Sequence, residues 1–126
     1  MNKLYNATDF ERAPGDFYPT PPDLTRGLID GLAQAAIALP GPILEPCCGA
    51  GALATVLAAE SGLEVVGSDL YPERYTEAAA LYATTSPVDA RDAAALLTVI
   101  EETGAAALVT NPPYGPAWSA GARWGR

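Results

Sequence analysis

Glycine and proline residues divide this chain into short apolar runs that alternate with helix-forming segments. Apolar residues at helical spacing indicate amphipathic helices, and short apolar runs bounded by turn residues indicate buried strands. A chain in which helices and strands alternate is predicted to form a parallel sheet with helices on both faces. The expected helices cover residues 22–39, 52–60, 72–84 and 92–103, and the expected strands cover 43–44, 64–68, a short piece around Val88, and 105–110.

The first expected helix follows a proline-rich segment. Thr20 precedes Pro21 and Pro22. A threonine is a good N-cap and proline is tolerated in the first turn, so we expect Thr20 to cap this helix. We expect Pro40-Gly41-Pro42 to end it.

Length and composition fit one intracellular globular domain. The chain has 126 residues, enough for one domain but not two, and its 49% hydrophobic content suits a folded core. No charged-then-apolar leader opens it, and its apolar runs are too short to span a bilayer. Adjacent Cys47 and Cys48 rarely meet disulfide geometry, so we expect reduced thiols in a cytoplasmic protein. We expect a flexible arm over 1–16, the domain over 17–115 and an irregular tail over 116–126.

The charge balance limits the chemistry. The formal net charge is −8 with only seven Lys and Arg, which argues against this chain holding a polyanion unaided. There is no histidine, so the commonest general base, Ser-His triads and His-ligated metal sites are excluded. Two adjacent thiols with no other nearby ligand make a poor zinc site. We therefore expect no metal, and any catalysis must proceed without imidazole.

A small-residue turn between the second helix and the strand before it predicts a nucleotide site. Gly49 and Gly51 let the backbone turn tightly and let a ligand approach the helix that follows. Asp69 ends the next strand, twenty residues after Gly49, where an acid can bind ribose hydroxyls. The spacing Gly49-x-Gly51-x-x-Ala54 also satisfies the dinucleotide fingerprint, so a nicotinamide dehydrogenase remains an alternative.

Glu45 favours a positively charged ligand over a dinucleotide. A pyrophosphate is anionic and binds best at a positive helix N-terminus. Glu45 lies at the mouth of the same turn, where its carboxylate suits a ligand that carries positive charge. S-adenosylmethionine has an ammonium, a sulfonium and a ribose that suits Asp69, so we expect it rather than NAD.

Asn111-Pro112-Pro113-Tyr114 follows the last apolar run and predicts a clamp for a planar amine. Ligands bind outside the carboxyl ends of strands in open α/β sheets. The Asn111 amide oxygen can accept hydrogen bonds from an amino group, and the two prolines remove N–H donors that would compete for carbonyls. Tyr114 offers a flat face for stacking. The alternative is a proline-terminated strand with a buried tyrosine.

Taken together, these motifs resemble the class I S-adenosylmethionine-dependent methyltransferases, specifically the DNA N6-adenine methyltransferases. The resemblance extends over nearly all of residues 17–115, and the motifs come in the family order. It implies an α/β Rossmann-like fold, S-adenosylmethionine as cofactor, and methyl transfer to an exocyclic amino nitrogen, foremost N6 of adenine in DNA. The residues that carry it are Phe17-Tyr18-Pro19-Thr20-Pro21-Pro22, Glu45-Pro46-Cys47-Cys48-Gly49-Ala50-Gly51, Gly67-Ser68-Asp69, Asp92 and Asn111-Pro112-Pro113-Tyr114.

The resemblance also implies which residues bind the cofactor. Asp69 would take the ribose hydroxyls and Leu70 would pack on the adenine ring. Asp92 would accept from the adenine amino group with Ala93 beside it, although Asp89 competes for this role and Asp92 equally suits a helix N-cap. The methionine end and the pocket would be lined by Tyr18, Thr20, Pro21, Glu45, Pro46, Cys47, Gly49 and Gly51.

The resemblance assigns catalysis to the clamp. Asn111, which would also contact the cofactor, and the Pro112 carbonyl would hold the target amine. Pro113 completes the rigid backbone, and Tyr114 would stack on a base extruded from its helix.

The resemblance covers only part of the family fold. The family has seven strands and this sequence supplies four, so we expect an incomplete, cofactor-binding portion that needs a partner chain or a further C-terminal portion. DNA is the expected substrate, held weakly by this chain alone. The alternatives are methylation of a protein glutamine amide or an RNA base, and a non-catalytic cofactor-binding remnant or subunit.

Overall fold

The computed structural model describes residues 19–75, 83–84 and 86–113. The chain divides into two compact units, one formed by Pro19–Pro112 and the other by Met1–Tyr18 with Pro113–Arg126. Every element described below belongs to Pro19–Pro112. The expected arm over 1–16 and the expected tail over 116–126 lie outside the described residues, as do Tyr18 and Tyr114.

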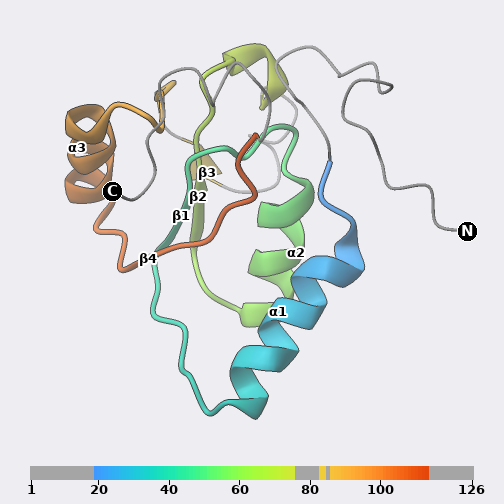
Figure 1. The fold of residues 1–126 in the computed structure, drawn as a ribbon. Helices are drawn as coiled ribbons and strands as arrows, with labels where there is room; N and C mark the ends of the chain where they lie inside the picture. The colour runs from blue at the N-terminus through green and yellow to red at the C-terminus, as the bar shows by residue number, and fades with distance from the viewer. Residues whose placement is uncertain (1–18, 76–82, 85, 114–126) are drawn as a thin grey trace, which may run out of the picture. The chain divides into compact units, whose positions relative to one another are not determined.

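Four parallel strands form the sheet (Figure 1). The strands are β1 (Ile43–Glu45), β2 (Val65–Gly67), β3 (Ala83–Thr84) and β4 (Ala107–Leu108), and their order across the sheet is β3-β2-β1-β4. Hydrogen bonds from Ala106 N to the Pro42 carbonyl and from Val109 N to the Leu44 carbonyl extend the pairing of β4 with β1 at both ends. The expected parallel α/β sheet is confirmed.

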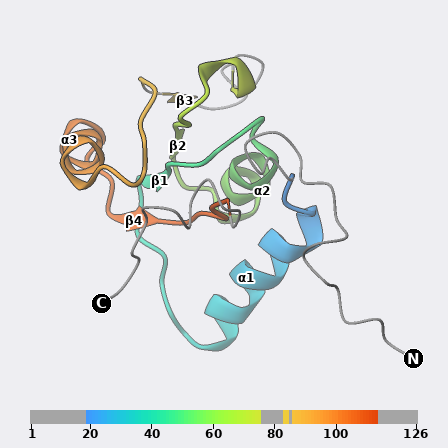
Figure 2. The same cartoon turned by 45° about the horizontal axis from the view of Figure 1, so that its top comes forward.

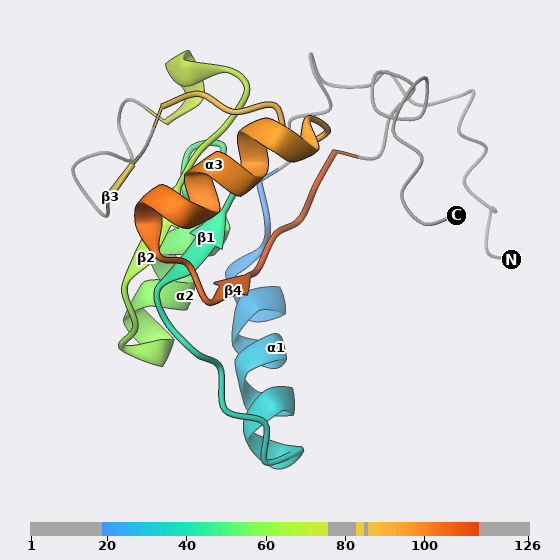
Figure 3. The same ribbon diagram turned by 90° about the vertical axis from the view of Figure 1, so that its left-hand side faces the viewer.

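Helices cover both faces of this sheet. Alternate residues of a strand point to opposite faces, so Ile43 and Val65 face one way while Leu44 and Val66 face the other. Figure 2 shows the sheet with α3 (Ala93–Thr103) on one side and with α1 (Pro22–Gln34) and α2 (Ala52–Ser61) on the other. Figure 3 views the sheet from the α3 side.

Two apolar clusters hold these layers together. On the α2 face, Leu57 and Ala54 are fully buried against the strands, and Ile29 of α1 packs at the edge of this cluster. On the α3 face, Val99 packs with Val88 against β1 and β2. Burying one such aliphatic side chain contributes about 1.5–3 kcal/mol, so the sheet is stabilised from both sides.

The second and last expected helices are confirmed, with bounds close to those predicted. α2 begins after Gly51 and ends at Gly62, whose φ of 69° closes the helix. In α3, the Asp92 carboxylate accepts from Ala94 N and Ala95 N, and Gly104 ends the helix with a φ of 66°. These are the N-cap and C-cap geometries that such residues favour.

The first helix is shorter than predicted, and Thr20 does not cap it. α1 ends at Gln34 instead of residue 39 because Ala36 takes a left-handed φ of 54°. Ile37 N then donates to the Leu32 carbonyl at 2.9 Å and Ala36 N to the Ala33 carbonyl at 3.1 Å, which is a Schellman ending. At the other end Pro21 takes the N-cap position without a side-chain cap, and the Thr20 hydroxyl accepts from Asn111 Nδ2 instead.

The helix expected over 72–84 and the strand expected around Val88 are both wrong within the described residues. Only Pro72–Arg74 form a short 3-10 turn, and residues 76–82 are outside the described part of the chain. Ala83 and Thr84 pair with Val66 and Gly67 as β3, so sheet pairing overrides the helix preference of this alanine-rich segment. Val88 is buried against the sheet but belongs to no strand.

The last strand is also shorter than the expected 105–110. β4 covers only Ala107–Leu108, which pair with Ile43 and Leu44 of β1. Leu108 is 47% exposed. Thr110 and Asn111 follow these paired residues, at the carboxyl end of β4.

Candidate functional site

The candidate residues lie at the carboxyl ends of β1, β2 and β4. Glu45 ends β1, Asp69 follows β2, and Asn111 follows β4. Because the strands are parallel and adjacent, these ends meet at one edge of the sheet. Side-chain hydrogen bonds connect the segments, from Gly49 N to Asp69 Oδ2, from Thr110 Oγ1 to Glu45 Oε1, and from Asn111 Nδ2 to Thr20 Oγ1. The structure thus brings together motifs that are far apart in the sequence.

The turn after β1 has the tight geometry that its small residues predict. Gly49 and Gly51 have φ angles of 51° and 90°, a conformation that L side chains rarely adopt. Cys48 N donates to the Ser68 carbonyl at 2.8 Å, and Gly51 N donates to the Cys48 carbonyl at 2.8 Å. Tyr75, which is buried, packs on Cys48. The turn is therefore fixed against the end of β2.

Asp69 holds this turn in place. Its side chain is buried, Oδ2 accepts from Gly49 N at 2.9 Å, and Oδ1 accepts from Tyr71 N at 2.9 Å. A carboxylate oxygen has two lone pairs and can accept more than one hydrogen bond. Asp69 is consequently a structural residue of the turn, and any contact with a ligand would be additional to that role.

Glu45 is the buried acid at the centre of the site. It is only 1% exposed, and its Oε1 accepts from the Thr110 hydroxyl and, at 3.2 Å, from Cys47 N. Its Oε2 is enclosed and has no hydrogen-bond partner among the described residues. A buried polar atom without a partner is unusual in a native fold and calls for an explanation.

Burial changes the proton affinity of this acid. Desolvation raises the pKa of Glu45 to about 7, the hydrogen bonds from Thr110 and Cys47 oppose that rise, and the nearby charge of Asp69 adds to it. Glu45 therefore exchanges its proton near neutral pH. A cation bound beside it would stabilise the ionised form and satisfy Oε2.

Burial disfavours the thiolate form of Cys47 in the turn. Burial, with a smaller contribution from Glu45, raises the pKa of the Cys47 thiol to about 12. Since the thiolate is the reactive form, Cys47 is inert at neutral pH. Cys48 is buried, and Cys47 and Cys48 are both free thiols. Cys47 and Cys48 serve as small residues that shape the turn.

Asn111 reaches back to the segment that precedes α1. Its Nδ2 donates to Thr20 Oγ1 at 3.1 Å, and Thr20 is buried with 7% exposure. Asn111, Pro112 and Pro113 are each half-buried, and Pro21 is exposed. This contact places Thr20 and Asn111 side by side.

The two acids proposed for the adenine contact are both engaged within the chain. Asp92 Oδ1 accepts from two N–H groups of α3 at 3.1 Å each, which is the N-cap role. Asp89 binds the Arg91 guanidinium at 2.7 and 2.8 Å, and this ion pair lowers the pKa of Asp89. Leu70 is half-buried and Ala93, the first residue of α3, is exposed.

Sequence analysis missed Thr110. Its hydroxyl donates to Glu45, which lies 65 residues earlier in the chain. The available signal was a polar β-branched residue directly before Asn111 at the end of a strand. Its partner follows only from the strand order, because β4 pairs with β1.

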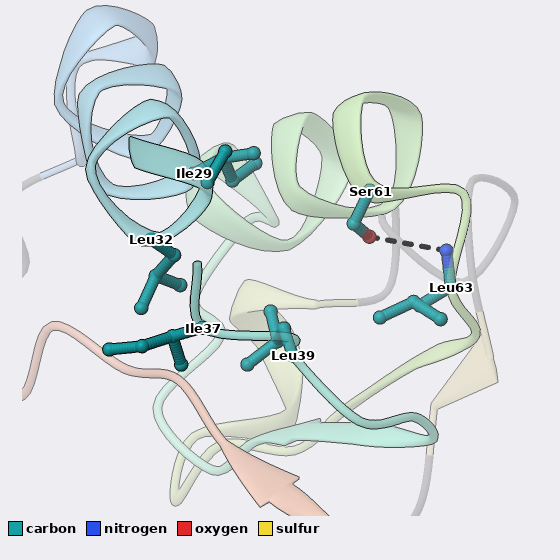
Figure 4. Close-up of a pocket in the computed structure, with 7 residues that line it drawn as sticks. Ile29, Leu32, Ile37, Leu39, Ser61 and Leu63 are labelled. Carbon is teal, nitrogen blue, oxygen red and sulfur yellow. Dashed lines mark hydrogen bonds between the residues drawn. The ribbon is translucent and has the colours of Figure 1, made fainter. Parts of the chain in front are cut away.

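A separate apolar pocket of about 220 Å³ lies at the opposite ends of the strands (Figure 4). Ser61 is the hydroxyl-bearing residue of its lining, and its Oγ donates to the Leu57 carbonyl at 2.6 Å and accepts from Leu63 N at 3.2 Å. Among the described residues, no charged side chain lines this pocket, and none of the candidate residues takes part in it. Its lining consists of Ile29, Leu32, Ala33, Ile37, Leu39, Ser61 and Leu63.

Three further observations complete the description of the site. In the described ranges, 19–75, 83–84 and 86–113, no helix has the length and apolar character needed to cross a membrane. Within the same ranges, no three His, Cys, Asp or Glu side chains are grouped so that they could hold a metal ion. Comparisons with protein-family models, with curated proteins and with solved structures gave no match.

Proposed function

We propose that this chain binds S-adenosylmethionine and transfers its methyl group to an exocyclic amino nitrogen, foremost N6 of adenine in DNA. One observation carries the proposal: the buried Glu45, whose Oε2 has no partner among the described residues, lies beside the glycine turn and is hydrogen-bonded to the segment that holds Asn111. The strand order β3-β2-β1-β4 supports a partial Rossmann-like arrangement, since the classic order begins 3-2-1-4.

The charge of the site favours this ligand over a dinucleotide. Glu45 and Asp69 are both buried and close enough for their charges to interact. Asp69 and the ionised form of Glu45 would repel a pyrophosphate and attract a cation. An ammonium group would supply the donor that Glu45 Oε2 needs. A bound ribose would donate its hydroxyls to Asp69, with Leu70 beside the adenine ring.

The protein's part in the reaction is orientation. S-adenosylmethionine supplies an activated methyl group, and an amine attacks it in line. The lone pair of an exocyclic amine is delocalised into its ring, so acceptors on its hydrogens raise the electron density at nitrogen. Asn111 and the Pro112 carbonyl would provide these acceptors, with no donor on Pro113 to compete for the carbonyl. Correct positioning of the reactants can by itself supply a large part of the rate enhancement of an enzyme.

Thr20 would set the direction of the Asn111 amide. Nδ2 donates to the Thr20 hydroxyl. With the nitrogen directed to Thr20, Oδ1 becomes the amide atom suited to accept from the target amine. Tyr18, Pro21 and Tyr114 would complete the surroundings of the methionine end and the base, and Asp92 or Asp89 would accept from the adenine amino group.

Methyl transfer to nucleic acid tests this function directly. The full chain is incubated with S-adenosylmethionine carrying a labelled methyl group and with unmethylated DNA. Label appearing at N6 of adenine, and absent when those positions are already methylated, supports the proposal. Label in RNA or in a protein glutamine supports the alternative substrates. Cofactor binding without transfer to any of them supports a non-catalytic subunit, and absence of both overturns the proposal.

A further inference from the structure

We infer that Thr110 is a positioning residue whose hydrogen bond to Glu45 couples the cofactor side of the candidate site to the placement of Asn111 and Pro112. This inference rests on the proposed function and extends it to a residue outside the predicted motifs. It concerns how the glycine turn beside Glu45 and the segment that contains Asn111 are held in fixed positions relative to each other.

One oxygen atom joins three segments of the site. Glu45 Oε1, at the end of β1, accepts from the Thr110 hydroxyl after β4 and from Cys47 N in the glycine turn. Thr110 directly precedes Asn111 in the sequence. A displacement of the Glu45 carboxylate would therefore move both the turn and the clamp.

The Thr110 hydroxyl adds a side-chain contact to the backbone pairing that precedes Asn111. A backbone hydrogen bond from Val109 N to the Leu44 carbonyl at 3.2 Å extends the pairing of β4 with β1 beyond Leu108. Pro112 and Pro113 have no N–H and cannot continue a ladder. The Thr110 side chain thus links the end of the sheet to Asn111, and the Thr20 contact holds Asn111 from the other side.

The coupling arises from Oε2 of the same carboxylate, which has no partner among the described residues. A cation that donates to Oε2 favours ionised Glu45, and ionised Glu45 is the stronger acceptor for the Thr110 hydroxyl. The titratable groups that face Glu45 are Asp69 after β2 and Cys47 in the turn. The charge of Asp69 disfavours the ionised form of Glu45, and the Cys47 thiol stays neutral at pH 7. The Thr110 hydrogen bond and a bound cation would both favour the ionised form, and so would oppose the effect of Asp69.

The experiment compares Thr110→Val with Thr110→Ser. Valine keeps the shape and removes the hydroxyl, whereas serine keeps the hydroxyl. Thr110 is exposed, so neither change disturbs the core. We expect Thr110→Val to weaken S-adenosylmethionine binding about tenfold at pH 7, as loss of a hydrogen bond to a charged group predicts. The pH at which affinity rises should also move upward, while Thr110→Ser stays within about twofold of the wild type.

A double-mutant cycle in thermal unfolding gives a readout without ligand. Glu45→Gln and Thr110→Val, singly and together, should have non-additive effects because the two residues share a bond. Thr110→Ala serves as a second variant without the hydroxyl and should behave as Thr110→Val does.

The outcomes separate the inference from the proposed function. If the wild type binds neither S-adenosylmethionine nor its demethylated product, both are overturned. If the wild type binds and Thr110→Val matches it in affinity and pH profile, the inference alone is overturned. Additive unfolding effects, or a Thr110→Ser variant as weak as Thr110→Val, also overturn the inference.

Discussion

Asn111 donates its side-chain amide to the hydroxyl of Thr20, 91 residues earlier in the chain. The bond joins the segment before α1 to the segment after β4, and within the described part of the chain no sheet pairing connects the two. Thr20 was expected to cap α1, but it is buried beside Asn111, and Pro21 takes the N-cap position.

Thr20→Val should therefore damage the site more than the fold. A neutral hydrogen bond contributes about 0.5–1.5 kcal/mol, so the free energy of unfolding should fall by roughly that amount. If the bond orients the Asn111 amide, methyl transfer should fall by about tenfold or more. Thr20→Ser, which keeps the hydroxyl, is the control. Equal activity of Thr20→Val and the wild type would refute the orienting role.

Asn111→Ala should separate transfer from binding. The variant removes the amide that would accept from the target amine, so labelled methyl transfer should fall by about 100-fold. Affinity for S-adenosylmethionine, measured by calorimetry, should change by less than a factor of about three, because Glu45 and the turn remain. Normal transfer by this variant would show that the clamp is assigned to the wrong residues.

Gly51→Ala should destabilise the turn. Its φ of 90° is strained for any residue with a Cβ, and the expected loss is about 1–2 kcal/mol in the free energy of unfolding. Gly27→Ala is the matched control, because Gly27 lies inside α1 with nothing within 4 Å of an added Cβ. That control should gain about 0.5–1 kcal/mol from helix propensity. Urea titration of both variants tests the contrast, and equal effects would contradict it.

Stability should fall as pH rises from about 5 to 7. Burial raises the pKa of Glu45 from 4.5 to about 7, so in this range the folded chain binds more protons than the unfolded chain. The free energy of unfolding then decreases with rising pH, by up to roughly 3 kcal/mol for this shift. The ion pair with Arg91 lowers the pKa of Asp89, so Asp89 titrates below this window. Glu45→Gln should flatten the profile, and an unchanged profile would show that another group is responsible.

Asp92→Ala and Asp92→Asn distinguish the capping role from a cofactor contact. Alanine removes the bonds to Ala94 N and Ala95 N and should cost about 1 kcal/mol of stability, whereas asparagine is also a good N-cap. If Asp92 only caps α3, S-adenosylmethionine affinity stays unchanged in Asp92→Asn. Loss of affinity in Asp89→Ala would instead assign the adenine contact to Asp89.

The sequence predicts the parts of the fold that depend on local signals. Gly62, Asp92 and Gly104 mark helix ends by their own backbone and capping chemistry, and the structure confirms all three. The early end of α1 was missed because Ala36 adopts a left-handed conformation that alanine seldom takes. β3 was missed because pairing with Val66 and Gly67 decides its conformation, and alanine-rich composition alone suggests a helix.

In the candidate site too, local features could be predicted from the sequence and long-range contacts could not. Glycine spacing and the acid after β2 were recognisable from sequence, and the structure adds that Asp69 fastens the turn by accepting from Gly49 N. The partners of Glu45 and Thr20 depend on strand order and on contacts across 65 and 91 residues. Contacts between residues so far apart in the sequence leave no local sequence pattern, so the role of Thr110 could be identified only from the fold.

Calorimetric titration of the full chain with S-adenosylmethionine tests the central claim most directly. Glu45→Gln is the informative variant, and Glu102→Gln, an exposed acid of α3, is the matched control. We predict that the wild type and Glu102→Gln bind S-adenosylmethionine and not NAD, and that Glu45→Gln loses about tenfold or more in affinity. A folded wild-type chain that prefers NAD, or that binds S-adenosylmethionine equally well with Glu45→Gln, would contradict the assignment of this site.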